Sequence, residues 1–213
     1  MIRLLIFCSL CIIVISCKQK DTSVNEVTSL PENIDIIVNE IPISEEKTDD
    51  IKLFEENPNF ASNGFDFPIG KPNARGYYNA QKFKEHNHLG DDWNGVGGGN
   101  SDLGDPIYSV ANGYISEVKD YEGGWGNVVR IVHLHDNKLY ESLYAHCDTM
   151  LVTQDTFIKK GEQIATIGNC NGTYLAHLHL EIRNEIGLDI GLGYSENIIG
   201  YLDPTDFINK NRN

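Results

Sequence analysis

The sequence predicts a mostly β domain built from antiparallel strands with long loops. From about residue 61 onward, apolar and polar residues alternate with a period of two in one segment after another. Turn-forming pairs such as Asn112-Gly113 and Asp136-Asn137 separate these segments. Helical periodicity is scarce there, and the remaining chain of roughly 150 residues is long enough to bury a proper core.

The expected strands follow one another along the second half of the chain. They are residues 106–111, 113–118, 127–134, 139–146, 164–167 and 175–182. The segments 127–134 and 139–146 are expected to pair as a hairpin across Asp136-Asn137. Near the end of the chain, Asp203-Pro204-Thr205-Asp206 begins a short predicted helical turn.

The N-terminus has the pattern of an export signal. Residues 1–3 carry one positive charge, and residues 4–16 form an almost wholly apolar run. A helix that crosses a bilayer needs roughly 20 apolar residues, so this run is too short to span one and fits a secretory signal peptide.

A cysteine at the end of the apolar run predicts a lipid anchor. Val14-Ile15-Ser16-Cys17 resembles a bacterial lipobox, in which residues 1–16 are removed and Cys17 carries lipid. Several acyl chains hold a protein durably on a membrane, so we expect an exported protein of the cell envelope, facing the periplasm or the surface. A conventional signal peptide with an incidental cysteine is the alternative.

Residues 17–60 are predicted to form an acidic tether ahead of a domain that spans residues 61–213. The segment has eleven Asp or Glu against four Lys and no glycine, a composition that tends to stay extended and solvated. The whole chain has a formal net charge of -14, which excludes the basic footprint of a nucleic-acid-binding protein.

Two histidine motifs suggest a metal site. The first is His88-Leu89-Gly90-Asp91-Asp92 and the second is His177-Leu178-His179-Leu180-Glu181. Two imidazoles and one carboxylate would leave a fourth zinc position open for water, as in catalytic zinc sites. Tyr144-Ala145-His146 offers a further imidazole. Spacing alone does not choose Asp91 over Asp92, or His88 over His86.

In an extended segment, His177, His179 and Glu181 share one face. Glu181 is expected to orient a histidine rather than to act in the reaction. The other histidines are expected to be structural. His86 would be a surface neighbour of the first motif, and His133 and His135 would have packing or turn roles.

An ordered set of short motifs resembles the lysostaphin/LytM-type zinc endopeptidases. The set comprises His88-x-Gly90-x-Asp92, residues 104–108, 111–113 and 126–129, Tyr144-Ala145-His146, Gly161-Glu162 and residues 177–181. The resemblance covers residues 86–183. It implies an antiparallel β-sheet domain of the lysostaphin/LytM (duplicated hybrid motif) type, whose long loops form a groove for cell-wall peptide.

Carried over position by position, the resemblance implies that His88, Asp92 and His179 bind one zinc ion per chain. It implies that His146 and His177 serve the reaction. No motif position is missing, which argues against an inactive relative. The segment 94–102 departs from shorter family members, so the rim of the groove is not predicted.

The sequence therefore indicates a lipid-anchored zinc endopeptidase that hydrolyses peptide cross-links of peptidoglycan. Its expected partners are peptidoglycan peptide stems and a membrane, and nucleic acid is not among them. One alternative is a non-catalytic regulator that binds the cell wall or activates an amidase. Another is a zinc-storing lipoprotein with an accessible histidine cluster and no groove.

Two further predictions concern cysteines and aromatic residues. Cys147 and Cys170 remain in an exported domain, where a disulfide between them is one hypothesis and two small buried thiols are the alternative. Four aromatic residues either line the groove or anchor the core. They are Tyr77, Tyr78, Trp93 and Trp125.

Overall fold

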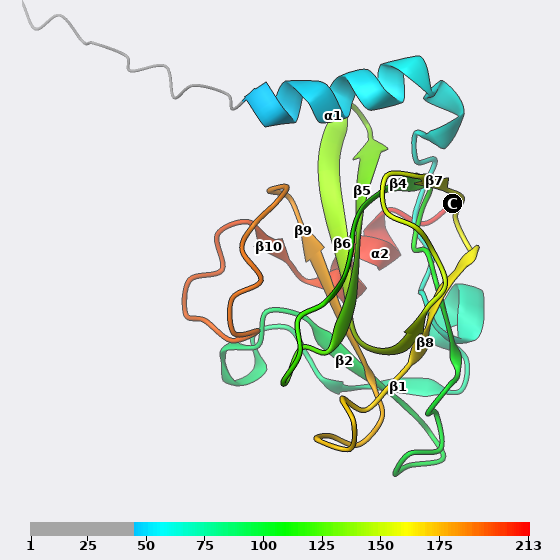
Figure 1. Ribbon diagram of the computed structural model, residues 1–213, viewed down its shortest axis with the longest axis vertical. Helices are drawn as coiled ribbons and strands as arrows, with labels where there is room; N and C mark the ends of the chain where they lie inside the picture. The colour runs from blue at the N-terminus through cyan, green and yellow to red at the C-terminus, as the bar shows by residue number, and fades with distance from the viewer. Residues whose placement is uncertain (1–44) are drawn as a thin grey trace, which may run out of the picture. The chain divides into compact units, whose positions relative to one another are not determined.

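The computed structural model describes residues 45–213, and side chains from residue 49. The predicted signal peptide, Cys17 and the first part of the predicted tether lie outside the described residues. Within the described part, ten strands form one sheet in which every pairing is antiparallel, as the sequence predicts (Figure 1). Neither α-helix of this part is long and apolar enough to cross a membrane.

The strands have the following bounds: β1 (Tyr77–Gln81), β2 (Asp91–Gly95), β3 (Pro106–Tyr108), β4 (Gly113–Asp120), β5 (Asn127–His135), β6 (Lys138–Met150), β7 (Phe157–Ile158), β8 (Gln163–Ile167), β9 (Leu178–Arg183) and β10 (Tyr201–Leu202). The α-helices are α1 (Glu45–Glu56) and α2 (Pro204–Lys210). Short helical turns lie at Pro58–Phe60, Gly70–Ala74 and Glu85–Asn87.

The long strand β6 organises the sheet. The strand order is β1-β2-β9-β6-β5-β4-β7, with β10 beside β9 and with β8 joining β3 to β6. Up to Ala145, β6 pairs with β9, and from Cys147 onward it pairs with β8 instead. His146 therefore lies at the point where β6 changes partner from β9 to β8.

The predicted hairpin is confirmed. β5 and β6 pair up to His135 and Lys138, and both turn residues, Asp136 and Asn137, have positive φ, as a tight two-residue turn requires. β3 is shorter than predicted and ends at Tyr108. The short strands β1, β2, β7 and β10 were not predicted.

The larger of two clusters of buried apolar residues in the described part of the chain backs the sheet. The apolar residues of β9 (Leu178, Leu180 and Ile182) are fully buried in it, as their alternation with polar residues predicts. The opposite face of β9 is buried as well, since His179, Glu181 and Arg183 are nearly inaccessible. The polar face of this strand is therefore an interior surface rather than a solvent-facing one.

The prediction of an extended tether up to residue 60 is wrong for its last part. Helix α1 lies across the end of the β5–β6 hairpin (Figure 1). Phe54 of this helix is buried and packs edge-to-face on Phe157 of β7, with ring centroids 5.9 Å apart. Asn112 also donates to the carbonyl of Ala61 at 3.2 Å. Phe60 also stacks on Phe157, with ring centroids 4.7 Å apart. Two aromatic side chains thus anchor an otherwise acidic segment on the domain.

Candidate metal centre and active site

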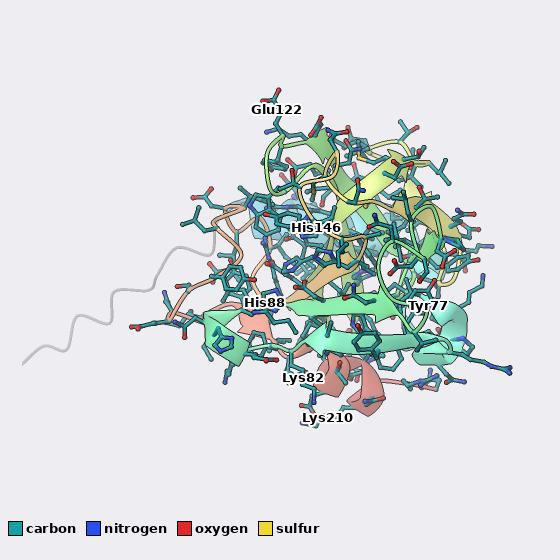
Figure 2. The ribbon with its side chains drawn as sticks, turned by 90° about the horizontal axis from the view of Figure 1, so that it is seen from below. Tyr77, Lys82, His88, Glu122, His146 and Lys210 are labelled. Carbon is teal, nitrogen blue, oxygen red and sulfur yellow. The ribbon has the colours of Figure 1, made fainter. Side chains whose placement is uncertain are left out.

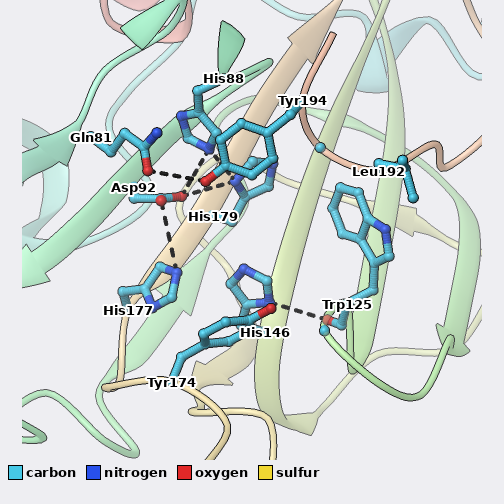
Figure 3. Close-up of a pocket in the computed structure, with 12 residues that line it drawn as sticks. Gln81, His88, Asp92, Trp125, His146, Tyr174, His177, His179, Leu192 and Tyr194 are labelled. Atoms are coloured by element: carbon cyan, nitrogen blue, oxygen red, sulfur yellow. Dashed lines mark hydrogen bonds and ion pairs between the residues drawn. The ribbon is translucent and has the colours of Figure 1, made fainter. Parts of the chain in front are cut away.

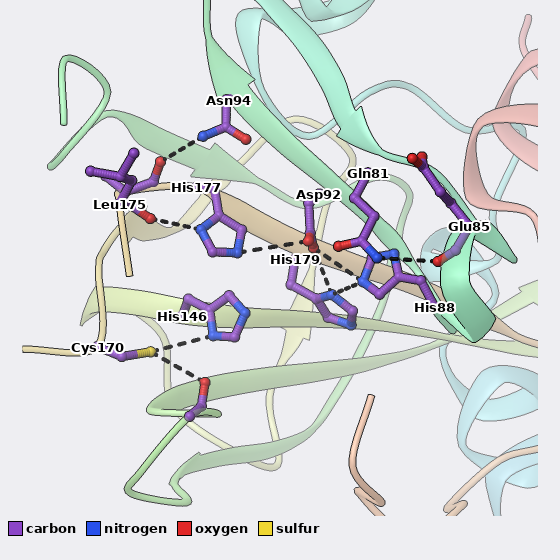
Figure 4. A network of polar contacts seen from close by, with 12 residues as sticks. Gln81, Glu85, His88, Asp92, Asn94, His146, Cys170, Leu175, His177 and His179 are labelled. Carbon is purple, nitrogen blue, oxygen red and sulfur yellow. Dashed lines mark hydrogen bonds and ion pairs between the residues drawn. The ribbon is translucent and has the colours of Figure 1, made fainter. Parts of the chain in front are cut away.

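Three side chains that are distant in the sequence converge where β2 meets β9. Asp92 lies directly opposite His179 in the antiparallel register, and His88 comes from the turn before β2. Oδ1 of Asp92 is 2.9 Å from Nδ1 of His179 and 3.3 Å from Nε2 of His88. The two ring nitrogens are 3.0 Å apart, so three donor atoms surround one point (Figure 4).

This donor set fits a metal ion. Nε2 of His179 donates its hydrogen to Oε1 of Glu181 at 3.1 Å, so in the neutral ring Nδ1 carries a lone pair. That lone pair faces a carboxylate oxygen and a second ring nitrogen, an arrangement that is favourable only with a proton or a cation between the three atoms. Imidazole nitrogen and carboxylate oxygen are both zinc ligands.

The close approach of these side chains shifts the pKa values of Asp92 and His179. Burial by itself raises the pKa of the Asp92 carboxyl, but hydrogen bonds with His179 and His88 hold that pKa well below its usual range. Burial by itself lowers the pKa of His179, but the carboxylates of Asp92 and Glu181 outweigh it and raise the pKa to about 9.

The structure distinguishes the two adjacent aspartates that the sequence left open. Successive residues of β2 point to opposite faces. Asp91 points away from the centre, where its carboxylate accepts from the backbone N–H groups of Phe83 and Thr205 at 3.0 and 3.1 Å. Asp91 thereby ties the start of α2 to β2, and Asp92 alone faces the histidines.

A buried ion-pair network supports His179 of the candidate metal centre. Oε2 of Glu181 accepts from Nε of Arg183 at 2.8 Å, and Nη1 of Arg183 donates to Oε1 of Glu141 at 3.0 Å. All three side chains are almost completely buried. Arg183 and Glu141 were not predicted from the sequence. The sequence feature that could have indicated Arg183 is its spacing, because a residue two positions after Glu181 lies on the same face of β9 as His179 and Glu181.

His177 lies beside the centre but is not part of the converging triad. It precedes β9, and its Nδ1 donates to the carbonyl of Leu175 at 2.8 Å, which leaves the lone pair on Nε2. Nε2 is 3.9 Å from Oδ2 of Asp92.

The segment before His177 is held by the 94–102 loop, because Asn94 and Asn100 form hydrogen bonds with the backbone of Ala176 at 3.0 and 2.8 Å. The 94–102 segment thus positions the second histidine motif.

His146 lies next to His177, with ring centroids 4.6 Å apart. Its backbone has a φ of 60°, a conformation that costs energy for a residue with a side chain and that occurs where β6 changes partner. Its Nδ1 is 3.3 Å from the carbonyl oxygen of Trp125. Burial, followed by the proximity of His179 and His177, lowers the pKa of His146 to about 3, so its ring is neutral.

These residues line one groove. Its cavity of about 400 Å³ contains the triad, His146 and His177, together with side chains that the sequence did not single out (Figure 3). The additional lining residues are Gln81, Gly124, Tyr174, Leu192, Gly193 and Tyr194. Figure 2 shows His88 and His146 toward the middle of the domain, whereas Glu122 and Lys210 lie at its edge.

The four aromatic residues divide between the groove and other roles. Trp125 lines the groove and donates from Nε1 to the carbonyl of Gly191 at 3.0 Å. Trp93 is a core residue, and Tyr77 donates to Asp105 at 2.6 Å. Tyr78 is half exposed on β1 and does not line the groove.

The predicted disulfide between Cys147 and Cys170 is wrong, since both are free thiols. Cys147 is buried in the core, and its Sγ lies 3.7 Å from the carbonyl oxygen of Tyr144. Cys170 follows β8 in a turn, and its Sγ lies 3.3 Å from Nδ1 of His146 (Figure 4). The two thiols therefore lie in different environments, one in the core and one beside His146.

The remaining histidines lie outside the centre, as predicted. His133 is buried, with Nδ1 donating to the carbonyl of Asn112 at 2.8 Å and Nε2 lying 2.7 Å from Oγ of Ser142. His135 packs edge-on against Phe65. His86 is exposed in the turn before His88.

An antiparallel β domain with a three-donor metal centre and two further imidazoles in one groove has the features of a metallopeptidase domain. The model of Peptidase family M23 matches residues 92–190. The chain is 44% identical over 80 residues to the lipoprotein NlpD of Yersinia enterocolitica, an alignment that covers 38% of this chain and 78% of that protein. The chain belongs to peptidase family M23.

Two other relatives are much longer than the shared region. The murein hydrolase activator NlpD of Salmonella dublin is 41% identical over 80 residues, which cover 38% of this chain but 20% of that protein. The peptidoglycan DD-endopeptidase ShyB of Vibrio cholerae is 32% identical over 80 residues, which cover 38% of this chain and 18% of that protein. The similarity therefore concerns the domain that carries the site.

Proposed function

We propose that this protein is a zinc-dependent endopeptidase that hydrolyses peptide cross-links of bacterial peptidoglycan. The observation that carries the proposal is the position of two imidazoles, His146 and His177, beside a complete three-donor metal centre in an open groove. Membership of a peptidase family and similarity to a protein named as a peptidoglycan endopeptidase support the same conclusion.

The zinc ion would be held by Nε2 of His88, Oδ1 of Asp92 and Nδ1 of His179. When bound, zinc polarises a carbonyl and lowers the pKa of water from 15.7 to about 7. The protein's own groups then move the protons. Nε2 of His177 has a free lone pair that faces the centre, and His146 is held neutral beside it. This pair accepts the proton of the attacking water and returns one to the leaving amine.

A second candidate is a non-catalytic regulator that activates an amidase. The observation in its favour is the similarity to proteins named as murein hydrolase activators. The complete set of His88, Asp92, His146, His177 and His179 weighs against it, since a regulator needs no proton-transfer groups beside the metal. A zinc-storing lipoprotein is disfavoured because His88 and His179 are buried below a groove rather than accessible.

The deciding experiment uses the chain from residue 17 onward, without lipid, and isolated peptidoglycan. We expect conversion of cross-linked dimers to monomers, identified by mass spectrometry, and loss of this conversion with a zinc chelator. The product masses also name the bond that is cut. A chain that binds one zinc ion, releases nothing and accelerates a purified amidase would replace the enzyme proposal with the regulator.

We also propose that Cys17 anchors the protein in a membrane of the cell envelope. The lipobox-like sequence and the name of the Yersinia relative as a lipoprotein support this. Replacing Cys17 with Ser is expected to move the protein from the membrane fraction to the soluble fraction of cells. Cys11→Ser, within the predicted signal peptide, is the matched control and should leave the protein in the membrane fraction.

A further inference from the structure

Tyr194 is held over the metal centre by the backbone. It forms an isolated antiparallel bridge with His88. On either side of this bridge, the N–H of Leu89 donates to the carbonyl of Gly193 at 3.0 Å, and the N–H of Ser195 donates to the carbonyl of Asn87 at 2.8 Å. Although Tyr194 belongs to the long loop between β9 and β10, its position is therefore fixed relative to a metal ligand.

The side chain of Tyr194 is aimed at the same place. Its ring lies against the ring of His88, with centroids 5.1 Å apart. The phenol donates to Oε1 of Gln81 at 3.1 Å, and Gln81 is itself oriented by donating from Nε2 to the carbonyl of Glu85 at 3.1 Å. About half of the Tyr194 side chain is exposed, and it lines the groove together with Asp92.

The groove therefore has two chemically different sides. In Figure 3, His177 and His146 lie on one side of Asp92, whereas Tyr194 and Gln81 lie on the other. The first side offers imidazoles that accept or transfer protons. The second side offers a phenol O–H, which stays protonated at neutral pH because the ordinary pKa of tyrosine is about 10.

We propose that Tyr194 is a further catalytic residue that donates a hydrogen bond to the carbonyl oxygen of the scissile peptide bond. This inference rests on the endopeptidase function proposed above. Water attack on an amide builds negative charge on that oxygen, and a hydrogen-bond donor fixed in advance stabilises it. The substrate oxygen takes the place of Gln81 as the acceptor of the phenol hydrogen bond. The proton stays on Tyr194 throughout, so the two imidazoles still carry all the proton transfers.

The test is Tyr194→Phe, which removes only the hydroxyl group. Loss of one such donor typically lowers kcat by about 10²- to 10³-fold. We expect a fall of that order on peptidoglycan or an isolated cross-linked peptide, with KM changed much less. Zinc affinity, measured by titrating the metal-free protein, should stay within about twofold of wild type, because the phenol is not among the converging donor atoms.

Tyr78→Phe is the matched control. Tyr78 has the same exposed fraction as Tyr194, 49%, but lies on β1 outside the groove, so its rate should be unchanged. A wild-type protein that cuts cross-links together with a Tyr194→Phe variant of equal kcat would overturn this inference and leave the endopeptidase function standing. A wild-type protein that cuts nothing would overturn both.

A second readout separates stabilisation of the transition state from simple positioning. A phosphinic analogue of the cross-linked peptide places a charged oxygen where the carbonyl oxygen develops charge. Tyr194→Phe is expected to weaken binding of this analogue by a factor similar to the loss in kcat, and to leave binding of the product peptide nearly unchanged. Equal weakening of both ligands would contradict a role in the reaction itself.

Discussion

Glu181 accepts the hydrogen bond from Nε2 of His179 at 3.1 Å, while Nδ1 of the same ring faces Asp92 at 2.9 Å. The carboxylate of Glu181 thus decides which nitrogen of His179 is available to a metal ion. Arg183 fixes Glu181 in turn from the far side. The proposed metal centre is therefore preorganised by charges that lie deeper in the domain than its three donor side chains.

Glu181→Gln is expected to weaken zinc binding by about 10- to 100-fold, the usual cost of losing a partner that orients a ligand. It should also lower the free energy of unfolding by about 3 kcal/mol, because Arg183 stays buried without its main counter-charge. Zinc affinity is measured by competition with a chromophoric chelator, and stability by urea unfolding of the metal-free protein.

Glu117→Gln provides the control for this prediction. Glu117 forms an ion pair with the buried Arg130 at 3.2 Å but has no contact with a metal ligand. Its replacement should lower stability and leave zinc affinity unchanged. Equal zinc affinities for the two variants would mean that Glu181 does not orient His179.

The two imidazoles beside the centre are expected to behave differently from the ligands. His177→Ala and His146→Ala should each bind zinc with near wild-type affinity yet lose about 10²- to 10⁴-fold in kcat, the usual contribution of a general acid or base. His179→Ala should lose the metal itself. His86→Ala, at an exposed position near the first motif, should change neither quantity. Metal content by atomic emission and cleavage rate on peptidoglycan check all four variants, and a normal rate for both His177→Ala and His146→Ala would refute their assignment.

The sequence indicated the residues that converge in the groove better than it indicated the residues that support them, for physical reasons. Motif residues such as His88 and His179 are recognisable because zinc accepts few ligand types. The choice of Asp92 over Asp91 depended on which face of β2 each residue occupies, and β2 is too short to show a readable alternation. Glu141 and Arg183 were invisible as a pair because they lie on different strands, and only the register of β6 with β9 brings them opposite each other.

The strands and helices were likewise predicted to different extents. Long alternating segments such as β5 and β6 were predicted nearly to their ends, because burial of one face fixes their pattern. Helix α1 was missed because its sequence is acidic and only Phe54 among its described residues is fully buried. The groove wall from the loop after β9 was missed as well, because Tyr194 is placed by backbone pairing with residues more than 100 positions earlier, and no local pattern reveals such pairing.

A buried histidine outside the site predicts how stability changes with pH. Burial lowers the pKa of His133 to about 4 from an ordinary value of 6.5. The unfolded chain therefore takes up a proton below pH 6.5 that the folded protein accepts only near pH 4. The contribution of His133 is complete above pH 6.5 and is lost progressively between pH 6.5 and 4, by about 3 kcal/mol in all.

His133→Gln tests this prediction, since it replaces the titrating imidazole with a side chain that does not titrate. Urea unfolding of the metal-free protein at several values between pH 7 and 4 should give a steeper fall in stability for wild type than for the variant. His146, whose pKa is also lowered, contributes to both curves, so the difference between them isolates His133. Parallel curves would mean that His133 is already charged in the folded protein.

The packing of α1 predicts how two substitutions in this helix change the free energy of unfolding. Phe54 is 1% exposed and contacts Phe157 of β7, whereas Ile51 on the same helix is 39% exposed. Removing a buried Phe side chain typically costs 3–5 kcal/mol, so Phe54→Ala should lower the free energy of unfolding by about 3 kcal/mol at this peripheral site. Ile51→Ala should cost well under 1 kcal/mol. Both variants should bind zinc and cut peptidoglycan like wild type, because α1 lines no part of the groove. Equal stability of Phe54→Ala and wild type in urea unfolding would show that the segment before residue 57 behaves in solution as the free tether that its composition predicts.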